Sequence, residues 1–362
     1  MAALEKMFFD VSCALAKSPG DVHFSFKNLI SSPPTSLPDN FLNFIALDFS
    51  DNGTFEAASQ YIKKNNITCV LCFDVQPNAK VCKLFRECGV QKIVSYWGST
   101  MSGINHGLKL LLKKIEVFLN PNKPDHFIFE SNAMREFAVQ GRGISKNNTS
   151  VIPTGVDTQK FKPNSSAIDY VTNEFKFPHN AKIIFYSGHM ESRKGVHVIV
   201  NSAIELVDKR EQNNIYFLIC GNRPGEEKPF LDTLQNHKAN EHVVFAGYRN
   251  DLAKIMPGCT VGVVASTGWD SFPMSTLEMA ASGLPIVVSN LQGLTETLED
   301  GVTGFTFEPG NSYELADKIV KLLSDQVNYA TFSSSSVKRI ANGYSVQHQF
   351  NNLKTCLEKI FV

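Results

Sequence analysis

Short apolar runs alternate with longer amphipathic segments along almost the whole of this 362-residue chain. The apolar runs lie at residues 21–26, 43–49, 67–73, 92–96, 126–129, 182–187, 215–220, 242–246, 261–265 and 285–288. Segments with helical periodicity lie between or after them, at 4–17, 55–64, 79–87, 108–119, 133–139 and 313–323. Such alternation favours parallel sheets covered by helices. We therefore predict an α/β fold, and the length favours two domains.

Composition excludes several classes of function. Lysine plus arginine number 35, as do aspartate plus glutamate, so the chain has no basic footprint for a nucleic-acid partner. No apolar run is long enough to span a bilayer, and the first residues lack the features of a signal peptide, so we expect a cytoplasmic protein. Cys69 and Cys72 would lie on opposite faces of one strand, which favours buried thiols over a disulfide or a metal site.

Two carboxylates mark a candidate binding turn. Asp270 and Glu278 lie between the apolar runs 261–265 and 285–288, with seven residues between them, and Gly283 ends the helix predicted there. In an open α/β sheet such a strand-to-helix turn lies at the carboxyl end of the strands, where ligands bind. Carboxylate oxygens accept hydrogen bonds from hydroxyl groups, so the turn suits a sugar or a ribose.

A second turn is basic. Arg193 and Lys194 follow the apolar run 182–187 and stand directly before Gly195 and a predicted helix. Two cations beside a helix N-terminus can clamp a phosphate, which is our preferred interpretation. The alternative is that both side chains are simply solvated at the start of a helix.

These segments resemble those of the retaining GT-B glycosyltransferases of family 4. Residues 268–285 resemble the E-x7-E motif of that family, with Asp270 in place of the first glutamate. Residues 186–195 resemble its phosphate-binding turn, although the usual arginine falls at His189. Residues 152–157 with Phe161, 290–296 and 300–305 resemble three further segments, and all the matches run in order between about 126 and 325. The resemblance implies two Rossmann-like domains facing a cleft.

The resemblance also implies the domain layout. We expect an N-terminal, acceptor-side domain at 1–155 and a C-terminal, nucleotide-sugar-binding domain at 165–340, with the boundary in the polar stretch 154–180. The final helix, within 344–362, would pack on the N-terminal domain, as it does in the family. The family's first domain begins with a strand, whereas a helical pattern already starts at residue 4 here. We therefore expect that domain to lack its first strand, by truncation or by loss, and to have exposed sheet edges.

The donor site follows from the resemblance. Glu278 would bind the ribose hydroxyls, Asp270 would contact the transferred sugar, and Arg193 with Lys194 would stabilise the leaving diphosphate. Asp270, Lys194 and Arg193 are thus the candidate catalytic residues. The other donor-side candidates are Gly188, His189, Gly221, Asn222, Tyr248, Ser271, Phe272, Pro273, Met274, Ser275, Thr276 and Leu277. Tyr248 is equally well explained by surface packing, and Glu278 alone could be an exposed helical carboxylate. No metal or other cofactor is expected.

The acceptor side is less well defined by the sequence. Many family members carry a histidine after the fourth N-terminal strand, where this chain has Trp97, Gly98 and Ser99. The ring of Trp97 could stack on a sugar, or it could be structural. In the helix predicted at 108–119, apolar residues occupy positions 108, 111, 112, 115 and 119, with Lys109 and Lys113 opposite. We expect this helix to pack on the sheet with its lysines in water; the alternative is a surface that meets lipid-linked acceptors at a membrane, as in related enzymes.

The resemblance therefore implies a retaining glycosyltransferase. It would move a sugar from a nucleotide diphosphate to a saccharide or glycolipid acceptor, in surface polysaccharide assembly, in the cytoplasm or in peripheral contact with a membrane. Two alternatives stay open. One is a nucleotide-sugar 2-epimerase on the same fold, and the other is a non-catalytic nucleotide-sugar-binding or scaffold subunit, which His189, Asp270 and the missing strand favour. The oligomeric state is not predicted.

Overall fold

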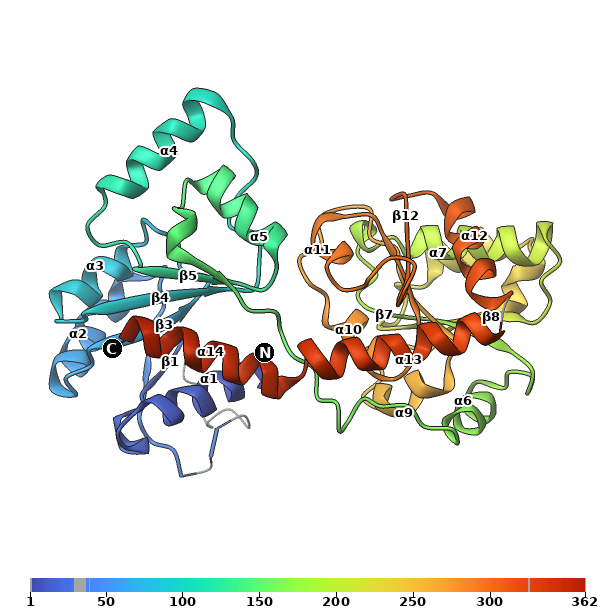
Figure 1. Cartoon of the computed structure of the whole chain (residues 1–362), viewed down its shortest axis with the longest axis horizontal. Helices are drawn as coiled ribbons and strands as arrows, with labels where there is room; N and C mark the ends of the chain where they lie inside the picture. The colour runs from blue at the N-terminus through green and yellow to red at the C-terminus, as the bar shows by residue number, and fades with distance from the viewer. Residues whose placement is uncertain (1, 29–36, 39, 325, 362) are drawn as a thin grey trace. The chain divides into compact units, whose positions relative to one another are not determined.

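The computed structural model describes residues 2–28, 37–38, 40–324 and 326–361, and it divides into two compact units (Figure 1). The N-terminal unit comprises Met1–Pro153 together with Gln349–Val362, and the C-terminal unit comprises Thr154–His348. Each unit contains a parallel sheet with helices packed against it. Two parallel α/β units are the architecture that the alternating apolar pattern predicts.

The C-terminal unit is built on a six-stranded parallel sheet in the order β12-β11-β10-β7-β8-β9. Its strands are β7 (Lys182–Ser187), β8 (Ile215–Cys220), β9 (Val243–Phe245), β10 (Val261–Val264), β11 (Ile286–Ser289) and β12 (Gly304–Phe307). The chain builds outward from β7 to β9, returns to β10 on the other side of β7, and then continues to β12. The sheet therefore has a topological switch point between β7 and β10, the position where open α/β sheets bind ligands.

Helices cover both faces of this sheet. Successive residues of a strand point to opposite faces, and in these strands the residues on either face are apolar, so each face must be buried. In β7, for example, Ile184 and Tyr186 belong to one core cluster, whereas Ile183 and Phe185 belong to the other. The helices are α6 (Ala167–Phe175), α7 (Val196–Ile204), α8 (Lys228–Leu234), α9 (Leu252–Ile255), α10 (Met274–Ala281), α11 (Gln292–Thr295), α12 (Ser312–Leu323) and α13 (Gln326–Gly343). Residues of α7 and α12 contribute to the first cluster, and residues of α10 to the second.

The N-terminal unit has a four-stranded parallel sheet, β3-β4-β5-β6, and a separate parallel pair, β1-β2. The strands are β1 (Phe24–Phe26), β2 (Phe44–Ala46), β3 (Cys69–Phe73), β4 (Lys92–Trp97), β5 (His126–Phe129) and β6 (Thr149–Val151). The helices are α1 (Ala2–Leu15), α2 (Phe55–Lys64), α3 (Lys80–Glu87), α4 (Gly107–Leu119), α5 (Asn132–Phe137) and α14 (Val346–Phe361). Leu353 of α14 packs in one core with Met7 and Val11 of α1 and with Val94 of β4, so the last helix packs on this unit.

The outer edge of β3 is open in the described part of the chain. Asp74 N donates to Tyr96 O and Lys92 N donates to Thr68 O, so the even-numbered residues pair with β4. The N–H and C=O groups of Cys69, Leu71 and Phe73 therefore point to the opposite edge. Helix α1 spans the gap to the β1-β2 pair, because its Phe8 contacts Phe73 and its neighbour Phe9 contacts Phe24 of β1.

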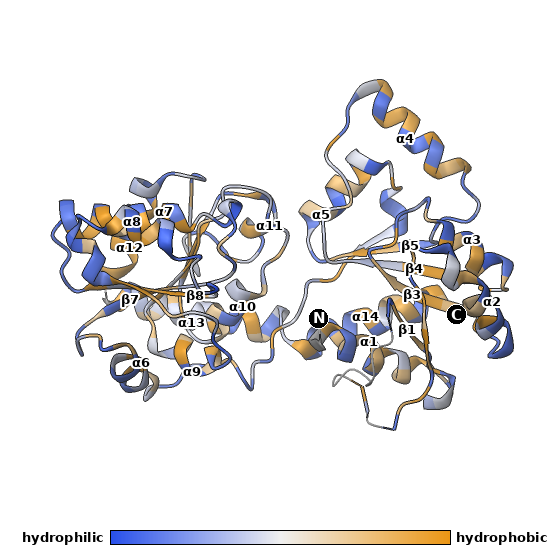
Figure 2. Ribbon diagram, turned by 180° about the vertical axis from the view of Figure 1, so that it is seen from behind, coloured by the Kyte–Doolittle hydropathy of each residue, from blue (hydrophilic) through white to orange (hydrophobic). Residues whose placement is uncertain are grey.

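Helix α4 begins one residue before the predicted range 108–119 and ends where predicted, but it does not have the predicted packing. Its apolar residues Leu108, Leu111, Leu112, Ile115 and Leu119 are all exposed, although we expected them to pack on the sheet. The helix packs instead through its other side on a short π-helical segment, Ala138–Arg142, and it stands apart from the sheet (Figures 1 and 2). The expectation failed because amphipathic spacing shows that a helix has an apolar face, but not what that face contacts.

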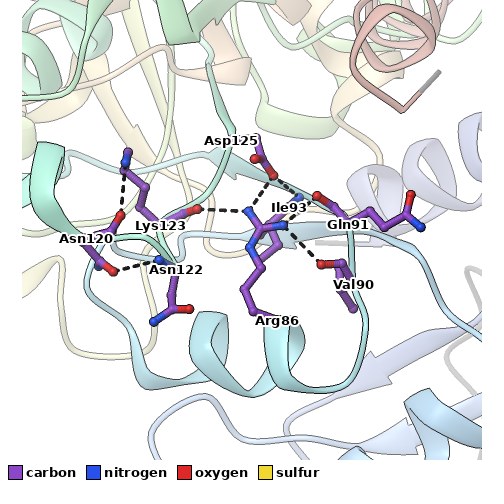
Figure 3. A network of polar contacts seen from close by, with 8 residues as sticks. All are labelled: Arg86, Val90, Gln91, Ile93, Asn120, Asn122, Lys123 and Asp125. Atoms are coloured by element: carbon purple, nitrogen blue, oxygen red, sulfur yellow. Dashed lines mark hydrogen bonds and ion pairs between the residues drawn. The ribbon is translucent and has the colours of Figure 1, made fainter.

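The loop that follows α4 is tied to the sheet. Lys123 Nζ donates to Asn120 O at 3.0 Å, and Arg86 Nη2 donates to Lys123 O at 3.3 Å (Figure 3). The same guanidinium donates to Asp125 Oδ2 at 2.8 Å, and this carboxylate accepts from Ile93 N of β4 at 2.7 Å (Figure 3).

Candidate functional site

Lys194 and Asp270 meet at the switch point of the C-terminal sheet. Lys194 follows β7 and Asp270 follows β10, and these two strands are neighbours. The ammonium Nζ lies 2.8 Å from Asp270 Oδ2, and the two side chains are only 16% and 7% exposed. The predicted basic turn and acidic turn are therefore parts of one site, joined by a buried ion pair.

A glycine allows this close approach. Gly195 has φ +70° between the 3₁₀ turn Ser192–Lys194 and the start of α7, and a Cβ atom there would lie 1.7 Å from the carbonyl oxygen of Ala265. Only glycine fits both the backbone conformation and the space. Thr267 N then donates to Arg193 O at 2.8 Å, which fixes the basic turn against the end of β10.

The two cations of the basic turn have different surroundings. The side chain of Lys194 is only 16% exposed. That of Arg193 is about half exposed, with Nε 2.8 Å from Glu191 Oε2 and Nη1 donating to Trp269 O at 3.0 Å. His189, at the position of the usual arginine, is exposed and lies 3.7 Å from Glu191 Oε1. Arg193 therefore reaches across to the acidic turn, while His189 stays at the surface.

Sequence reasoning missed two side chains that hold these groups in place. Ser266 Oγ donates to Asp270 Oδ2 at 2.7 Å, so Asp270 is held from its own turn as well as by Lys194. Glu191 neutralises Arg193 from within the basic turn. Ser266 and Glu191 both lie in or next to the two turns that the sequence predicts as the site. A single serine or glutamate in a loop is common, however, and does not by itself indicate a contact with another residue.

Glu278 lies on α10 and differs from Asp270 in that no cation of the described residues forms an ion pair with it. Its carboxylate is half-buried, and among the contacts of the described residues it makes no hydrogen bond or ion pair. Burial raises the pKa of Glu278, and the charge of Lys160 acts in the opposite direction. A partly desolvated carboxylate without a partner is costly to keep ionised, which is typical of groups that are completed by a ligand.

Residues 271–277, between Asp270 and Glu278, comprise fully buried and partly buried side chains. Phe272, Thr276 and Leu277 are buried: Phe272 stacks on Tyr344, and Thr276 Oγ1 donates to Pro273 O. Their side chains therefore pack within the C-terminal unit, and the expected part of Phe272, Thr276 and Leu277 in donor binding stays a prediction. The partly buried residues of the run are Ser271, Pro273, Met274 and Ser275, and no side chain caps the N-terminus of α10.

The turns after β8 and β9 join the same sheet edge. Gly221 N donates to Gly247 O at 2.8 Å, and Gly188 N donates to Cys220 O at 3.1 Å. The amide of Asn222 accepts a hydrogen bond from Gly247 N at 2.9 Å, so this side chain is used to connect the turns. Tyr248 is 85% exposed beside them. The structure thus brings Gly188, Gly221, Asn222 and Tyr248 to the edge that carries Lys194.

For the acceptor-side candidates of the N-terminal unit, the structure favours the structural alternative for Trp97. Trp97 is buried and its Nε1 donates to Ser95 Oγ at 2.8 Å, so the ring offers no face for a sugar and serves the core. Gly98 N and Ser99 Oγ both donate to the carboxylate of Asp74, at 3.0 and 2.9 Å. Asp74 directly follows β3, and burial raises its pKa. Its position after an apolar run was the signal that sequence reasoning overlooked.

Comparison with known proteins finds a family match within the C-terminal unit. Residues 170–342 match the family model described as glycosyl transferases group 1. The chain is 24% identical over 249 residues to the Escherichia coli UDP-Gal:alpha-D-GlcNAc-diphosphoundecaprenol alpha-1,3-galactosyltransferase, covering 68% of this chain and 63% of the relative. It is 25% identical over 266 residues to the capsular polysaccharide biosynthesis glycosyltransferase CapM of Staphylococcus aureus, covering 71% and 66%. The chain thus spans less than two thirds of the length of these curated relatives.

Solved structures share the fold over most of this chain. A glycosyltransferase from Rickettsia africae superposes with a TM-score of 0.77 at 19% identity, over 88% of this chain and 85% of that one. Anabaena Alr3699/HepE in complex with UDP superposes with a TM-score of 0.71 at 19% identity, over 85% and 82%. The prediction of a GT-B fold with two parallel α/β units is confirmed.

Proposed function

We propose that this chain, whose residues 170–342 match the family model of the glycosyl transferases group 1, is a retaining glycosyltransferase. It moves a sugar from a nucleotide-diphosphate donor to a saccharide or glycolipid acceptor. The observation that carries the proposal is the buried Lys194–Asp270 pair at the switch point, next to the helix that bears the unpartnered Glu278. A cation and two carboxylates at one sheet edge match the phosphate and hydroxyl groups of a sugar nucleotide.

The donor is held by charge and by hydrogen-bond acceptors. A lysine ammonium has three N–H donors, so Lys194 can keep its bond to Asp270 and still donate to a phosphate oxygen. Arg193 supplies a second, more exposed cation beside it. Glu278 accepts hydrogen bonds from the ribose hydroxyls, and Asp270 keeps one oxygen, Oδ1, for a hydroxyl of the transferred sugar.

The chemistry needs little from acids and bases of the protein. The bond from the anomeric carbon to the leaving phosphate oxygen breaks, and the acceptor oxygen bonds to that carbon on the same face. The leaving phosphate oxygen takes the proton of the acceptor hydroxyl. The protein positions both substrates and stabilises the charge that grows on the diphosphate, which is the role of Lys194 and Arg193.

The relatives suggest which substrates to test first. UDP is the nucleotide bound in the Anabaena structure, and the Escherichia coli relative is named for UDP-Gal and for a diphosphoundecaprenol acceptor. We therefore favour a UDP-sugar donor, a lipid-linked saccharide acceptor and a role in surface polysaccharide assembly, in the cytoplasm at the membrane surface. We propose that this membrane contact is peripheral. No helix in the described part of the chain is long and apolar enough to cross a bilayer.

Thermal-shift measurements with UDP-, GDP- and ADP-sugars test the proposal, because a nucleotide that binds the native state raises its melting temperature. Lys194→Ala and Glu278→Ala should each abolish the shift. The matched controls are Lys254→Ala and Glu241→Ala, which remove exposed charges of the same unit that form no ion pair among the described residues, and they should keep it.

An unchanged shift in both site variants would contradict the site. A shift without transfer of labelled sugar to any acceptor of a panel would instead favour the non-catalytic subunit, and release of an epimerised nucleotide sugar would favour the epimerase.

A further inference from the structure

The acidic turn that carries Asp270 spans residues 265–273, between β10 and α10, and has no helical or strand structure. A segment without a repeating pattern of backbone hydrogen bonds depends for its shape on contacts with other parts of the chain. Lys194 and Arg193 hold one side of this turn, at Asp270 and at Trp269. The other side of the turn is held by residues that the catalytic chemistry does not use.

Phe272 anchors that other side of the acidic turn. Its side chain is 4% exposed, and its ring stacks on that of Tyr344, with the ring centroids 5.9 Å apart and the planes at 24°. Stacked aromatic rings are held by their burial and by the attraction between the rings. Because Phe272 lies only two residues after Asp270, the position of its ring constrains the backbone that carries the carboxylate.

Arg339, on α13, holds Tyr344 in place. Its guanidinium lies 4.9 Å from the centroid of the Tyr344 ring, and Nη2 donates to the hydroxyl of Tyr344 at 3.0 Å. The same nitrogen donates to Glu296 O at 3.0 Å, directly after α11. Helix α11 itself touches the acidic turn, since a Cβ atom on Gly293 would overlap the carbonyl oxygen of Ser271. Arg339 therefore joins two supports of the turn, the Tyr344 ring and α11.

The charge of Arg339 makes a purely structural role a poor explanation. Among the described residues Arg339 forms no ion pair, and its Nε is buried without a hydrogen-bond partner. Burying a cation without a counter-ion is unfavourable, and a stack of two aromatic rings is stable without one. The orientation that the guanidinium imposes on Tyr344, through the ring face and the hydroxyl together, accounts for its presence.

The backbone of Tyr344 is fixed as well, next to the points where the chain passes between the units, at 153–154 and 348–349. Val156 N donates to Tyr344 O at 2.8 Å, and Val346 N donates to Val156 O at 3.1 Å. Tyr344 is thus held from two directions, by the backbone of Val156 and by the side chain of Arg339. A residue fixed in this way can serve as a rigid support for the ring of Phe272.

We propose that Tyr344 and Arg339 are positioning residues that fix the acidic turn for the transferred sugar, and that they act through Phe272. This role rests on the proposed function, in which Asp270 Oδ1 accepts a hydrogen bond from a hydroxyl of that sugar. A misplacement of about 1 Å at a reacting centre can lower a rate on the order of a hundredfold. Loosening the turn therefore lowers kcat.

Binding of the free nucleotide should respond differently. The phosphates and the ribose are held by Lys194 and Glu278, which lie outside residues 265–273. A change at Tyr344 leaves both of these side chains in the chain, so the affinity for the nucleotide diphosphate is retained while transfer of the sugar is slowed. A residue that served only the stability of the fold would not separate these two quantities.

The test compares Tyr344→Leu, which removes the ring, with Tyr344→Phe, which keeps the ring and loses the hydroxyl bonded to Arg339. The nucleotide sugar that gives the largest thermal shift is the donor, and its nucleotide diphosphate is the binding probe. Tyr344→Leu should lower kcat at least about tenfold and change the dissociation constant of the nucleotide diphosphate less than about twofold. Tyr344→Phe should keep at least about a third of kcat, and Arg339→Met should fall between the two.

The matched control is Phe332→Leu. Phe332 also lies on α13, and its ring contacts that of Phe305 at a centroid distance of 5.2 Å, in the core cluster on the other face of the sheet. The control should lower the melting temperature to a similar extent as Tyr344→Leu and leave kcat as it is in the unaltered chain.

A second readout needs no substrate. Trp269 lies in the acidic turn, directly before Asp270, so quenching of its fluorescence by acrylamide reports how well the turn is held. Tyr344→Leu should raise the quenching constant, whereas Phe332→Leu should leave it unchanged. The other tryptophan, Trp97, lies in the N-terminal unit and contributes equally to all the variants.

Three results would overturn the inference: an unchanged kcat in Tyr344→Leu, an equal loss of kcat in Phe332→Leu, or a loss of nucleotide affinity as large as the loss of kcat. Each would reduce Tyr344 to a packing residue. If no nucleotide sugar shifts the melting temperature of the unaltered chain, the proposed function fails. A raised quenching constant in Tyr344→Leu would still show that Tyr344 holds the turn, and an unchanged constant would refute that as well.

Discussion

Replacing Lys194 by methionine should destabilise the C-terminal unit far more than a surface lysine would. Asp270 is 7% exposed, and without the ammonium it keeps only the hydroxyl of Ser266 among the contacts of the described residues. Leaving a buried charge without its partner costs about 3–5 kcal/mol. For a unit of this size that corresponds to a fall in melting temperature of roughly 6–20 °C.

The double variant Lys194→Met/Asp270→Asn distinguishes two effects of the single change: the loss of the lysine side chain, and the cost of leaving the Asp270 carboxylate without its partner. Because both charges are then absent, we expect it to be more stable than Lys194→Met alone by about 2 kcal/mol. Arg193→Met is the matched control, since Arg193 is 45% exposed and its pair with Glu191 is worth less than about 1 kcal/mol. Urea unfolding followed by tryptophan fluorescence measures all three variants, since Trp269 lies in the turn that carries Asp270 and the other tryptophan, Trp97, lies in the N-terminal unit and is common to all of them.

The reasoning would be refuted if Lys194→Met and Arg193→Met had similar effects, or if the Lys194 and Asp270 substitutions were additive. Either result would mean that Lys194 and Asp270 do not form a buried pair in solution. Their assignment to one binding site would then have no structural support.

Two further predictions concern the unpaired strand edge and the response to acid. The backbone amide of Leu71 should exchange its hydrogen with solvent faster than that of Val94. The reason is that β3 is open at its outer edge in the described chain, whereas β4 is paired on both sides. Equal protection of the two amides would show that another strand pairs with the outer edge of β3. The Arg249 guanidinium lowers the pKa of Asp251 from 3.8 to about 2, so this carboxylate stabilises the fold above about pH 4, and its contribution is lost as the pH falls towards 2. Asp251→Asn should flatten the dependence of the unfolding midpoint on pH in that window, and an unchanged slope would contradict the role of the pair.

Several elements could be predicted from sequence because their signals are local. The strands β5, β7 and β8 have the predicted bounds, since each is an apolar run bounded by polar or turn residues. The strands β6 and β12 were not predicted. Strand β6 has only three residues, which is too short to give an apolar pattern, and β12 begins at Gly304, a residue type that is unfavourable in strands. The helix α4 was placed correctly in the chain but wrongly in space.

For the site, the sequence alone determined the chemical types and the edge of the sheet where they lie. A cationic turn after one strand and two carboxylates after another follow from residue order, because parallel strands end at a common edge. Only the tertiary structure decided that Lys194 and Asp270, 76 positions apart, pair at 2.8 Å, whereas Glu278 forms no ion pair with any residue that the structure describes. It also decided that Trp97 lies in the core and that α4 turns its leucines outward. Contacts between distant segments depend on the order of strands in the sheet and on close approaches such as that of Gly195 to Ala265. A local pattern of residues predicts neither of these.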